Sequence, residues 1–257
     1  AVFVDVLDRA AYPAFAALAD DATWYRNATA VSDFTKWSVP SILTGRVPGV
    51  TSLPVPAHHP ASLFTLLGES HRPHVFEPIT GMCPVEICGR AQESSAEWVR
   101  GISRTLDTAY LHASVPADLA GGLPQVDQGW NEQAGASTLG ASIGVRWYEA
   151  HRKGRRREVL DFIGEIGESS DARPPLHYLH VLLPHEPFIY FPDGHRYTIE
   201  TRLPGLISRE RWRDDDWAAV QAYQRYLLQL AYVDTLLVQL LVRLKASGLY
   251  TRYLIVV

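Results

Sequence analysis

The sequence predicts an α/β fold, built as a three-layer sandwich in which a largely parallel sheet carries helices on both faces. Residues 1–6 form a short apolar run interrupted only by Asp5, as in strands of a parallel sheet buried on both sides, and residues 176–183 are typical of a second strand. Other segments carry apolar residues every three or four positions, the longest at 209–246, which indicates helices with one buried face. Strands that alternate with helices of this length favour a parallel sheet.

The composition is that of an ordinary globular protein. The chain has 257 residues, of which 47% are hydrophobic and 20% are charged, and such a chain can bury a substantial core. We expect a single domain over residues 1–257, because the sequence shows no internal repeat and no low-complexity tract. The net charge of −4 argues against a nucleic-acid partner, since nucleic-acid binders carry a basic excess. No uninterrupted apolar run is long enough to span a bilayer.

The expected elements alternate along the chain, beginning with the strand at 1–6, which contains Asp5. They continue with a helix at 8–22, a helix near Thr35, a Pro-rich loop at 48–60, a helix at 61–68, a strand at 74–77, helices at 94–114 and 142–168, a strand at 176–183, a helix at 209–246 and a strand at 253–257. The basic run at 152–157 is most simply a solvated face or a loop. Because the chain starts without Met and ends inside an apolar strand, we expect it to be part of a longer protein, with the fold incomplete at the C-terminus.

The segment around Thr35 is the most informative part of the sequence. Val39, Ile42 and Leu43 have helical spacing, and Gly45 is a typical helix stop. Thr35 therefore stands near the start of a helix, where two interpretations are open. Its hydroxyl is either an ordinary N-cap or a nucleophile in a site where the helix N-terminus favours anions.

Two further polar residues are predicted at the carboxyl ends of strands, the edge where open parallel sheets bind ligands. Asp5 ends the first strand, and a carboxylate in an apolar run is costly unless it is paired or bound to a metal. His185 comes just after the strand at 176–183. A Thr hydroxyl is a poor nucleophile unless a base or a metal activates it, and Asp5 with Thr35 gives only two of the ligands that a metal site needs.

The remaining candidates have simpler explanations. His177 and His180 stand three apart in a strand, which puts them on opposite faces, so we interpret both as structural. Asp234 sits in the apolar stripe of the long helix and is expected to serve as a packing or capping partner. The two cysteines, Cys83 and Cys88, form either a small disulfide loop, which would indicate an oxidising compartment, or a pair of partly buried thiols. The disulfide is favoured.

Several motifs together resemble the alkaline phosphatase/sulfatase superfamily, and most closely the sulfatase-like extracytoplasmic domains of actinobacterial membrane proteins. The likeness covers nearly the whole chain. The motifs that carry it are Tyr12-Pro-Ala-Phe-Ala-Ala-Leu-Ala19, Ala22-Thr-Trp-Tyr-Arg-Asn-Ala-Thr29, Val39-Pro-Ser-Ile-Leu-Thr-Gly-Arg46, Glu77-Pro-Ile-Thr-Gly-Met-Cys-Pro-Val-Glu-Ile-Cys88, Leu182-Leu-Pro-His-Glu-Pro-Phe188 and Asp234-Thr-Leu-Leu237.

The resemblance assigns roles by position. The sulfatase pattern Cys-x-Pro-Ser-Arg would place its nucleophile at Thr35 and its Arg at Val39. A Thr at this place is similar to phosphotransferase and phosphodiesterase branches, including lipoteichoic-acid synthases, rather than to formylglycine sulfatases. The resemblance implies that Thr35 and Asp5 bind a divalent metal ion (Mn, Zn, Ca or Mg). It also implies that His185 and Lys36 bind the anionic ester substrate.

Two departures from the family pattern stand out. The Asp-His-Gly metal motif of the family follows the strand that here ends at Val257, so the chain lacks it. The segment between Asp5 and Asp8 is shorter than in relatives, and Val6 replaces an acidic residue.

The sequence thus favours metal-dependent hydrolysis or transfer at a phosphate or sulfate ester, on cell-envelope substrates linked to lipid or glycan. We expect an extracytoplasmic domain at the cell membrane, attached through segments outside this chain. One alternative is an inactive relative that binds envelope glycan or lipid headgroups. The other is a purely structural extracytoplasmic domain.

Overall fold

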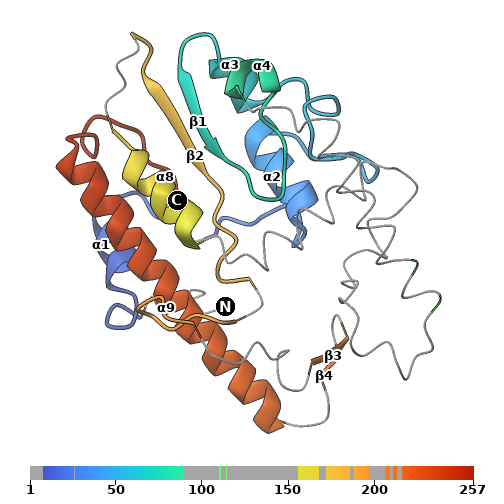
Figure 1. The fold of residues 1–257 in the computed structure, drawn as a ribbon, viewed down its shortest axis with the longest axis vertical. Helices are drawn as coiled ribbons and strands as arrows, with labels where there is room; N and C mark the ends of the chain where they lie inside the picture. The colour runs from blue at the N-terminus through green and yellow to red at the C-terminus, as the bar shows by residue number, and fades with distance from the viewer. Residues whose placement is uncertain are drawn as a thin grey trace. The chain divides into compact units, whose positions relative to one another are not determined.

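The computed structural model shows a mixed α/β chain and confirms the predicted fold class (Figure 1). It describes residues 8–25, 27–89, 156–167, 172–185, 188–196 and 216–257, the single residues Tyr110 and Ser114, and the backbone of 206–208 and 211–212. By its internal contacts the chain divides into two compact units, one made of residues 1–30 and 155–257 and the other of residues 31–154. The single-domain assignment stays a prediction.

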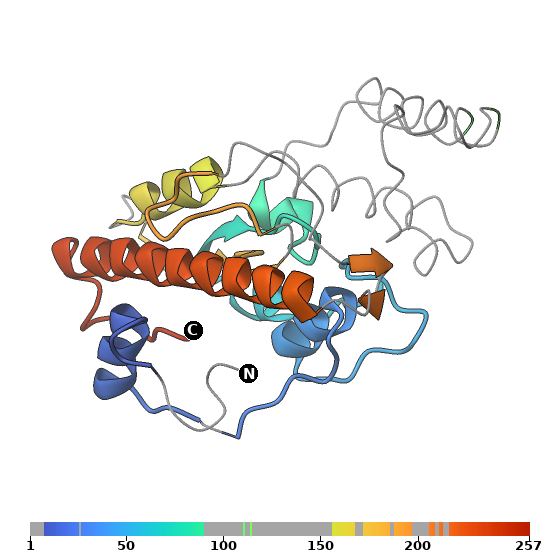
Figure 2. The same cartoon turned by 90° about the horizontal axis from the view of Figure 1, so that it is seen from below.

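The first unit is built along one helix, α9 (Asp216–Ala246). Two shorter helices, α1 (Pro13–Asp21) and α8 (Arg156–Glu165), pack against it (Figures 1 and 2). The apolar stripe of α9 is buried in this packing, as predicted. Its clusters with the α1 segment contain Tyr12, Ala16 and Leu230, and Ala14, Leu237 and Leu241.

The helix α9 starts later than predicted, at residue 216, and ends as predicted before Gly248, whose φ is 69°. Among the described residues it is the helix long and apolar enough to cross a membrane, but that is weak evidence because core helices pass the same test. Within its most apolar stretch of 18 residues, 44% of the stretch is buried in this structure. Its packing against α1 and α8 therefore accounts for the buried part of this apolar surface.

Asp234, a buried carboxylate on α9, caps the start of α1. Its two oxygens accept hydrogen bonds from the backbone amides of Ala14, at 3.1 Å, and Phe15, at 2.9 Å. The N-cap residue of α1, Tyr12, supplies no side-chain cap. Asp234 is only 4% exposed, so its charge is balanced by these amides and by the positive end of the α1 dipole. The predicted packing or capping role is confirmed.

Replacing Asp234 by Ala should lower the free energy of unfolding by about 1.5–3 kcal/mol, because two buried amides lose a charged acceptor. Asp234→Asn should recover part of this loss, since one amide oxygen can still accept. Asp216→Asn removes an exposed carboxylate from the same helix and serves as the control, with an expected cost of less than about 1 kcal/mol. Urea titration followed by far-ultraviolet circular dichroism measures all three. Equal losses at 216 and 234 would contradict the capping role.

The strands of the first unit are shorter than predicted. β2 spans Pro175–Leu179 instead of 176–183, and a cis peptide bond follows it between Leu183 and Pro184. β3 (Leu206–Ser208) and β4 (Arg211–Trp212) form a small antiparallel pair where a loop and the start of the long helix were expected.

The prediction of a strand at 253–257 is wrong. These residues carry no strand hydrogen bonds within the described part of the chain, and Leu254 and Val256 are exposed. An apolar run becomes a strand only where a neighbouring strand supplies hydrogen-bond partners. The predicted strand at 1–6, with Asp5, lies outside the described residues, as do most of the predicted helices at 94–114 and 142–168.

The second unit contains four described elements: α2 (Thr35–Thr44), α3 (Leu63–Leu67), β1 (Arg72–Phe76) and α4 (Val85–Cys88). The first three lie close to their predicted places, and α4 was not expected. α2 packs against α3, and α4 packs against β1. Ser62 and Thr65 form a reciprocal capping box at the start of α3.

A buried carboxylate and a disulfide hold the chain between β1 and α4. Glu77 is 3% exposed and accepts hydrogen bonds from the Thr80 hydroxyl and from the amides of Met82 and Cys83. Cys83 and Cys88 are joined by a disulfide with a Cα–Cα distance of 6.1 Å, which lies within the usual range. The predicted disulfide is confirmed in this structure.

Candidate active site

Thr35 is the first residue of α2, and its side chain does not cap the helix. The N-cap is Phe34, with extended φ and ψ of −94° and 126°. Ser32 fixes the chain just before it: its hydroxyl accepts from the Phe34 amide at 3.0 Å, and its carbonyl accepts from the Ser38 hydroxyl. The N-cap interpretation of Thr35 is therefore wrong. Among the described residues, the half-buried Thr35 hydroxyl has no hydrogen-bond partner.

The start of α2 also presents two unengaged backbone amides. The first helical hydrogen bonds run from the amides of Trp37 and Ser38 to the Phe34 carbonyl, both at 3.0 Å. The amides of Thr35 and Lys36 precede these and have no acceptor in the part of the chain that the structure describes. A hydroxyl, two amide donors and the positive end of a helix dipole thus meet at one place, and this combination suits an anion.

The cation nearest in sequence to this helix start is Lys36. Its ammonium group lies 4.1 Å from the centre of the Trp37 ring, a cation–π contact. Phe34 packs edge-on against the same ring, with centroids 5.5 Å apart. These contacts hold the Lys36 charge within one turn of Thr35. Its predicted role in substrate binding stays a prediction.

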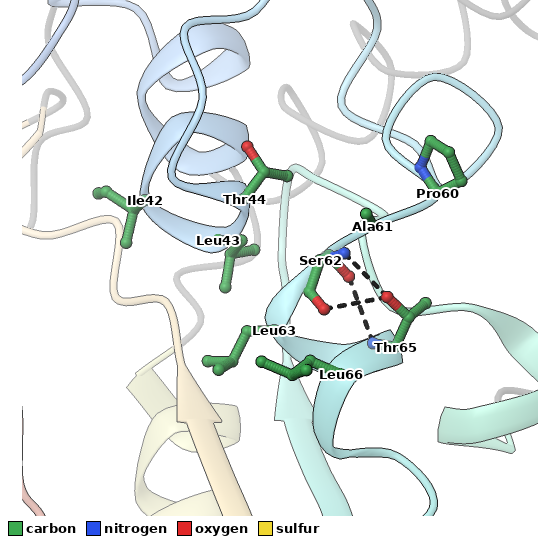
Figure 3. Close-up of a pocket in the computed structure, with 9 residues that line it drawn as sticks. All are labelled: Ile42, Leu43, Thr44, Pro60, Ala61, Ser62, Leu63, Thr65 and Leu66. Atoms are coloured by element: carbon green, nitrogen blue, oxygen red, sulfur yellow. Dashed lines mark hydrogen bonds between the residues drawn. The ribbon is translucent and has the colours of Figure 1, made fainter.

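The other end of α2 borders an apolar pocket of about 530 Å³ (Figure 3). Thr44, Ser62 and Thr65 contribute hydroxyls to its wall, and each is engaged with the backbone or with its capping partner. Because α2 rises about 1.5 Å per residue, Thr44 stands about 13 Å from Thr35 along the helix axis. The pocket is therefore separate from the Thr35 helix start.

His185 lies, as predicted, just beyond β2, in the first unit. It follows the cis Leu183–Pro184 bond, and its amide donates to the Leu182 carbonyl at 2.9 Å. The residue is exposed, and its carbonyl accepts a hydrogen bond from the Gln229 side chain on α9. The structure thus gives His185 an exposed position on a held backbone. Its role in substrate binding is a separate question that remains a prediction.

Metal binding has no support from the described residues. They contain no group of three or more His, Cys, Asp or Glu side chains arranged to hold an ion. Asp5, the predicted metal ligand, lies outside the described part of the chain. The unengaged Thr35 hydroxyl suits a metal ligand, but a single oxygen does not make a site.

His177 and His180 behave as structural residues, as predicted. His177 lies in β2, between the rings of Phe162 and Tyr253. His180 follows the strand, and its Nδ1 atom is buried without a hydrogen-bond partner among the described residues. Burial lowers the pKa of His180 to about 4 from an ordinary value of 6.5.

The low pKa of His180 predicts a loss of stability in mild acid. The unfolded chain takes up a proton below about pH 6.5, and the folded chain does so only below about pH 4. Stability should therefore fall as the pH drops from 6.5 to 4, by up to about 3 kcal/mol. His180→Gln should reduce this dependence when urea midpoints are measured at several pH values. An unchanged dependence in the variant would contradict the assignment.

The sequence interpretation missed three residues that shape these sites. Ser32 and Ser38 fix the start of α2, and Gln229 holds the His185 turn. The sequence pattern that indicates a role for Gln229 is a polar residue between leucines in the apolar stripe of a helix predicted to be buried. Ser32 and Ser38 lie six residues apart on either side of the helix start, and no sequence motif predicts a hydrogen bond between residues so placed.

Comparison with known proteins decides the family. A family model described as Sulfatase matches residues 7–257, nearly the whole chain. This chain belongs to the sulfatase family. Neither a search of curated proteins nor a search of solved structures found a significant match.

Sulfatase family membership supports a hydrolase-like enzyme that acts on sulfate or phosphate esters. The family usually uses a divalent metal ion. The match also agrees with the α/β class seen in the structure. It leaves the nucleophile, the substrate and the cellular location to be proposed.

Proposed function

We propose that this sulfatase-family protein is a metal-dependent hydrolase or transferase that acts on phosphate esters through Thr35. One observation carries the proposal: the Thr35 hydroxyl has no partner among the described residues and stands with two free amides at the start of α2. Family membership supplies the reaction class. The residue type supports phosphate over sulfate, since position 35 carries a Thr and not the Cys from which sulfatases make formylglycine.

The proposed reaction has two displacements at phosphorus. The Thr35 oxygen bonds to phosphorus, the ester bond to the leaving alcohol breaks, and the hydroxyl proton departs with that alcohol. Water or a second alcohol then attacks the Thr35 ester and releases the threonine hydroxyl. The amides of Thr35 and Lys36 stabilise the negative charge that develops on the phosphoryl oxygens. The Lys36 ammonium adds a positive charge to the same helix turn.

A divalent cation (Mn, Zn, Ca or Mg) is proposed as cofactor because the family usually uses one. Such an ion would lower the pKa of a hydroxyl nucleophile and neutralise phosphoryl charge. Asp5 is the proposed protein ligand, and it lies outside the described residues.

We also propose an extracytoplasmic location at the cell membrane, with envelope esters linked to lipid or glycan as substrates. The disulfide between Cys83 and Cys88 supports this location, because disulfides persist in oxidising compartments. Attachment to the membrane would come from segments outside this chain.

The nucleophile assignment predicts that Thr35→Ala lowers kcat for bis-(para-nitrophenyl) phosphate at least about 10³-fold, since removing a nucleophile abolishes the covalent route. Thr35→Ser keeps a hydroxyl and should retain measurable turnover. Thr44→Ala removes a hydroxyl from the other end of the same helix and is the matched control, with near-native turnover expected. Activity that survives in Thr35→Ala would refute the mechanism.

Metal dependence predicts that dialysis against a chelator abolishes turnover and that Mn or Zn restores it. Asp5→Asn should weaken the restoration and require more metal for half-maximal activity. Isothermal titration calorimetry with Mn separates this proposal from an inactive binding protein, since the latter would bind no metal and hydrolyse nothing. Full activity in the chelated protein would contradict metal dependence.

A further inference from the structure

The side chain of Gln229 makes four hydrogen bonds to the loop that contains His185. Its Oε1 accepts from the amides of Ile189, at 2.9 Å, and Tyr190, at 3.3 Å. Its Nε2 donates to the carbonyls of Pro184, at 3.2 Å, and His185, at 2.8 Å. Gln229 is fully buried in the middle of α9. A primary amide has two donors and two acceptor sites, and here every one of them is used.

We propose that Gln229 is the positioning residue for His185, a proposal that rests on the substrate-binding role proposed above for that histidine. The amide group of Gln229 holds the backbone at His185 and also holds it where the loop returns, at residues 189–190. The backbone atoms that carry the imidazole are thereby tied to the most extensively packed helix of the unit. The exposed side chain of His185 is thus attached to a backbone position that is held in place.

Gln is well suited to this task. The loop offers two carbonyls on one side and two amides on the other, so the side chain must donate and accept at once. Glu could accept from the amides but would face the two carbonyls with a buried negative charge. Met would match the length of Gln but would remove all four of these hydrogen bonds, two of them buried and two partly buried. Each buried group left without a partner carries a cost.

A second contact between α9 and this loop provides the matched control. The Thr235 hydroxyl donates to the Pro192 carbonyl at 2.8 Å. This bond also joins α9 to the loop that follows β2, but it attaches seven residues after His185. If Gln229 only adds stability, Gln229→Met and Thr235→Val should both lower the free energy of unfolding, by different amounts, and neither should change the imidazole of His185. If Gln229 positions His185, only the substitution at 229 should change the properties of the imidazole.

The experiment compares Gln229→Met, Gln229→Glu, Thr235→Val and His185→Ala with the unmodified protein. Nitrogen-labelled histidine gives the imidazole resonances of His185 by NMR, and steady-state kinetics with bis-(para-nitrophenyl) phosphate gives KM and kcat. We expect Gln229→Met to shift the His185 resonances and to raise KM about tenfold with a smaller change in kcat. Thr235→Val should leave both at their native values. Should the Met variant fail to fold, Gln229→Glu is measured in its place, with the same shift of the His185 resonances and the same rise in KM expected.

The double variant Gln229→Met/His185→Ala should have the KM of His185→Ala alone, because the two residues act through one contact. Additive effects, or native His185 resonances in folded Gln229 variants, would overturn the proposal. The resonances need no catalysis, so they test the positioning of His185 even if the unmodified protein proves inactive. In that case the proposed function fails while the positioning stands or falls on the NMR result.

Discussion

The first unit depends on buried and partly buried polar side chains of α9 that bind backbone from distant parts of the chain. Gln229 holds the loop at 184–190, Asp234 holds the start of α1, and Thr235 holds Pro192. Each sits in or beside an apolar stripe where an unpaired polar group would be costly. These contacts therefore specify which segments lie on α9, a choice that apolar packing alone leaves open.

In the second unit, the same kind of local polar pairing leaves Thr35 available. Ser32 and Ser38 fix the backbone just before α2, through the Phe34 amide and the Ser32 carbonyl. The Thr35 hydroxyl and two helix amides remain unengaged among the described residues. A helix start with free amides favours a negative charge. The absence of a side-chain cap on α2 thus connects local folding to the chemistry proposed for this sulfatase-family member.

How far the sequence predicted the structure depends on the range of the interactions involved. The apolar stripe and the end of α9, and the helix stop at Gly45, agree with the prediction because their signals are local, whereas the start of α9 lies seven residues later than predicted. The strand at 253–257 was wrong because an apolar run does not reveal its pairing partner. Asp234 was predicted from its place in an apolar stripe, whereas Gln229 offered the same signal and was overlooked. The proposed role of Thr35 comes from family resemblance, since its local sequence leaves the cap and the nucleophile both open.

The most direct measurement of the proposed chemistry is a search for the covalent intermediate. The protein, loaded with Mn, would be mixed with bis-(para-nitrophenyl) phosphate and quenched in acid within the first turnover, and its peptides would be analysed by mass spectrometry. The nucleophile assignment predicts that the phosphoryl group, with its remaining ester, is attached to Thr35 and that no such adduct forms in Thr35→Ala. An adduct on another residue, or turnover without any adduct on Thr35, would contradict it.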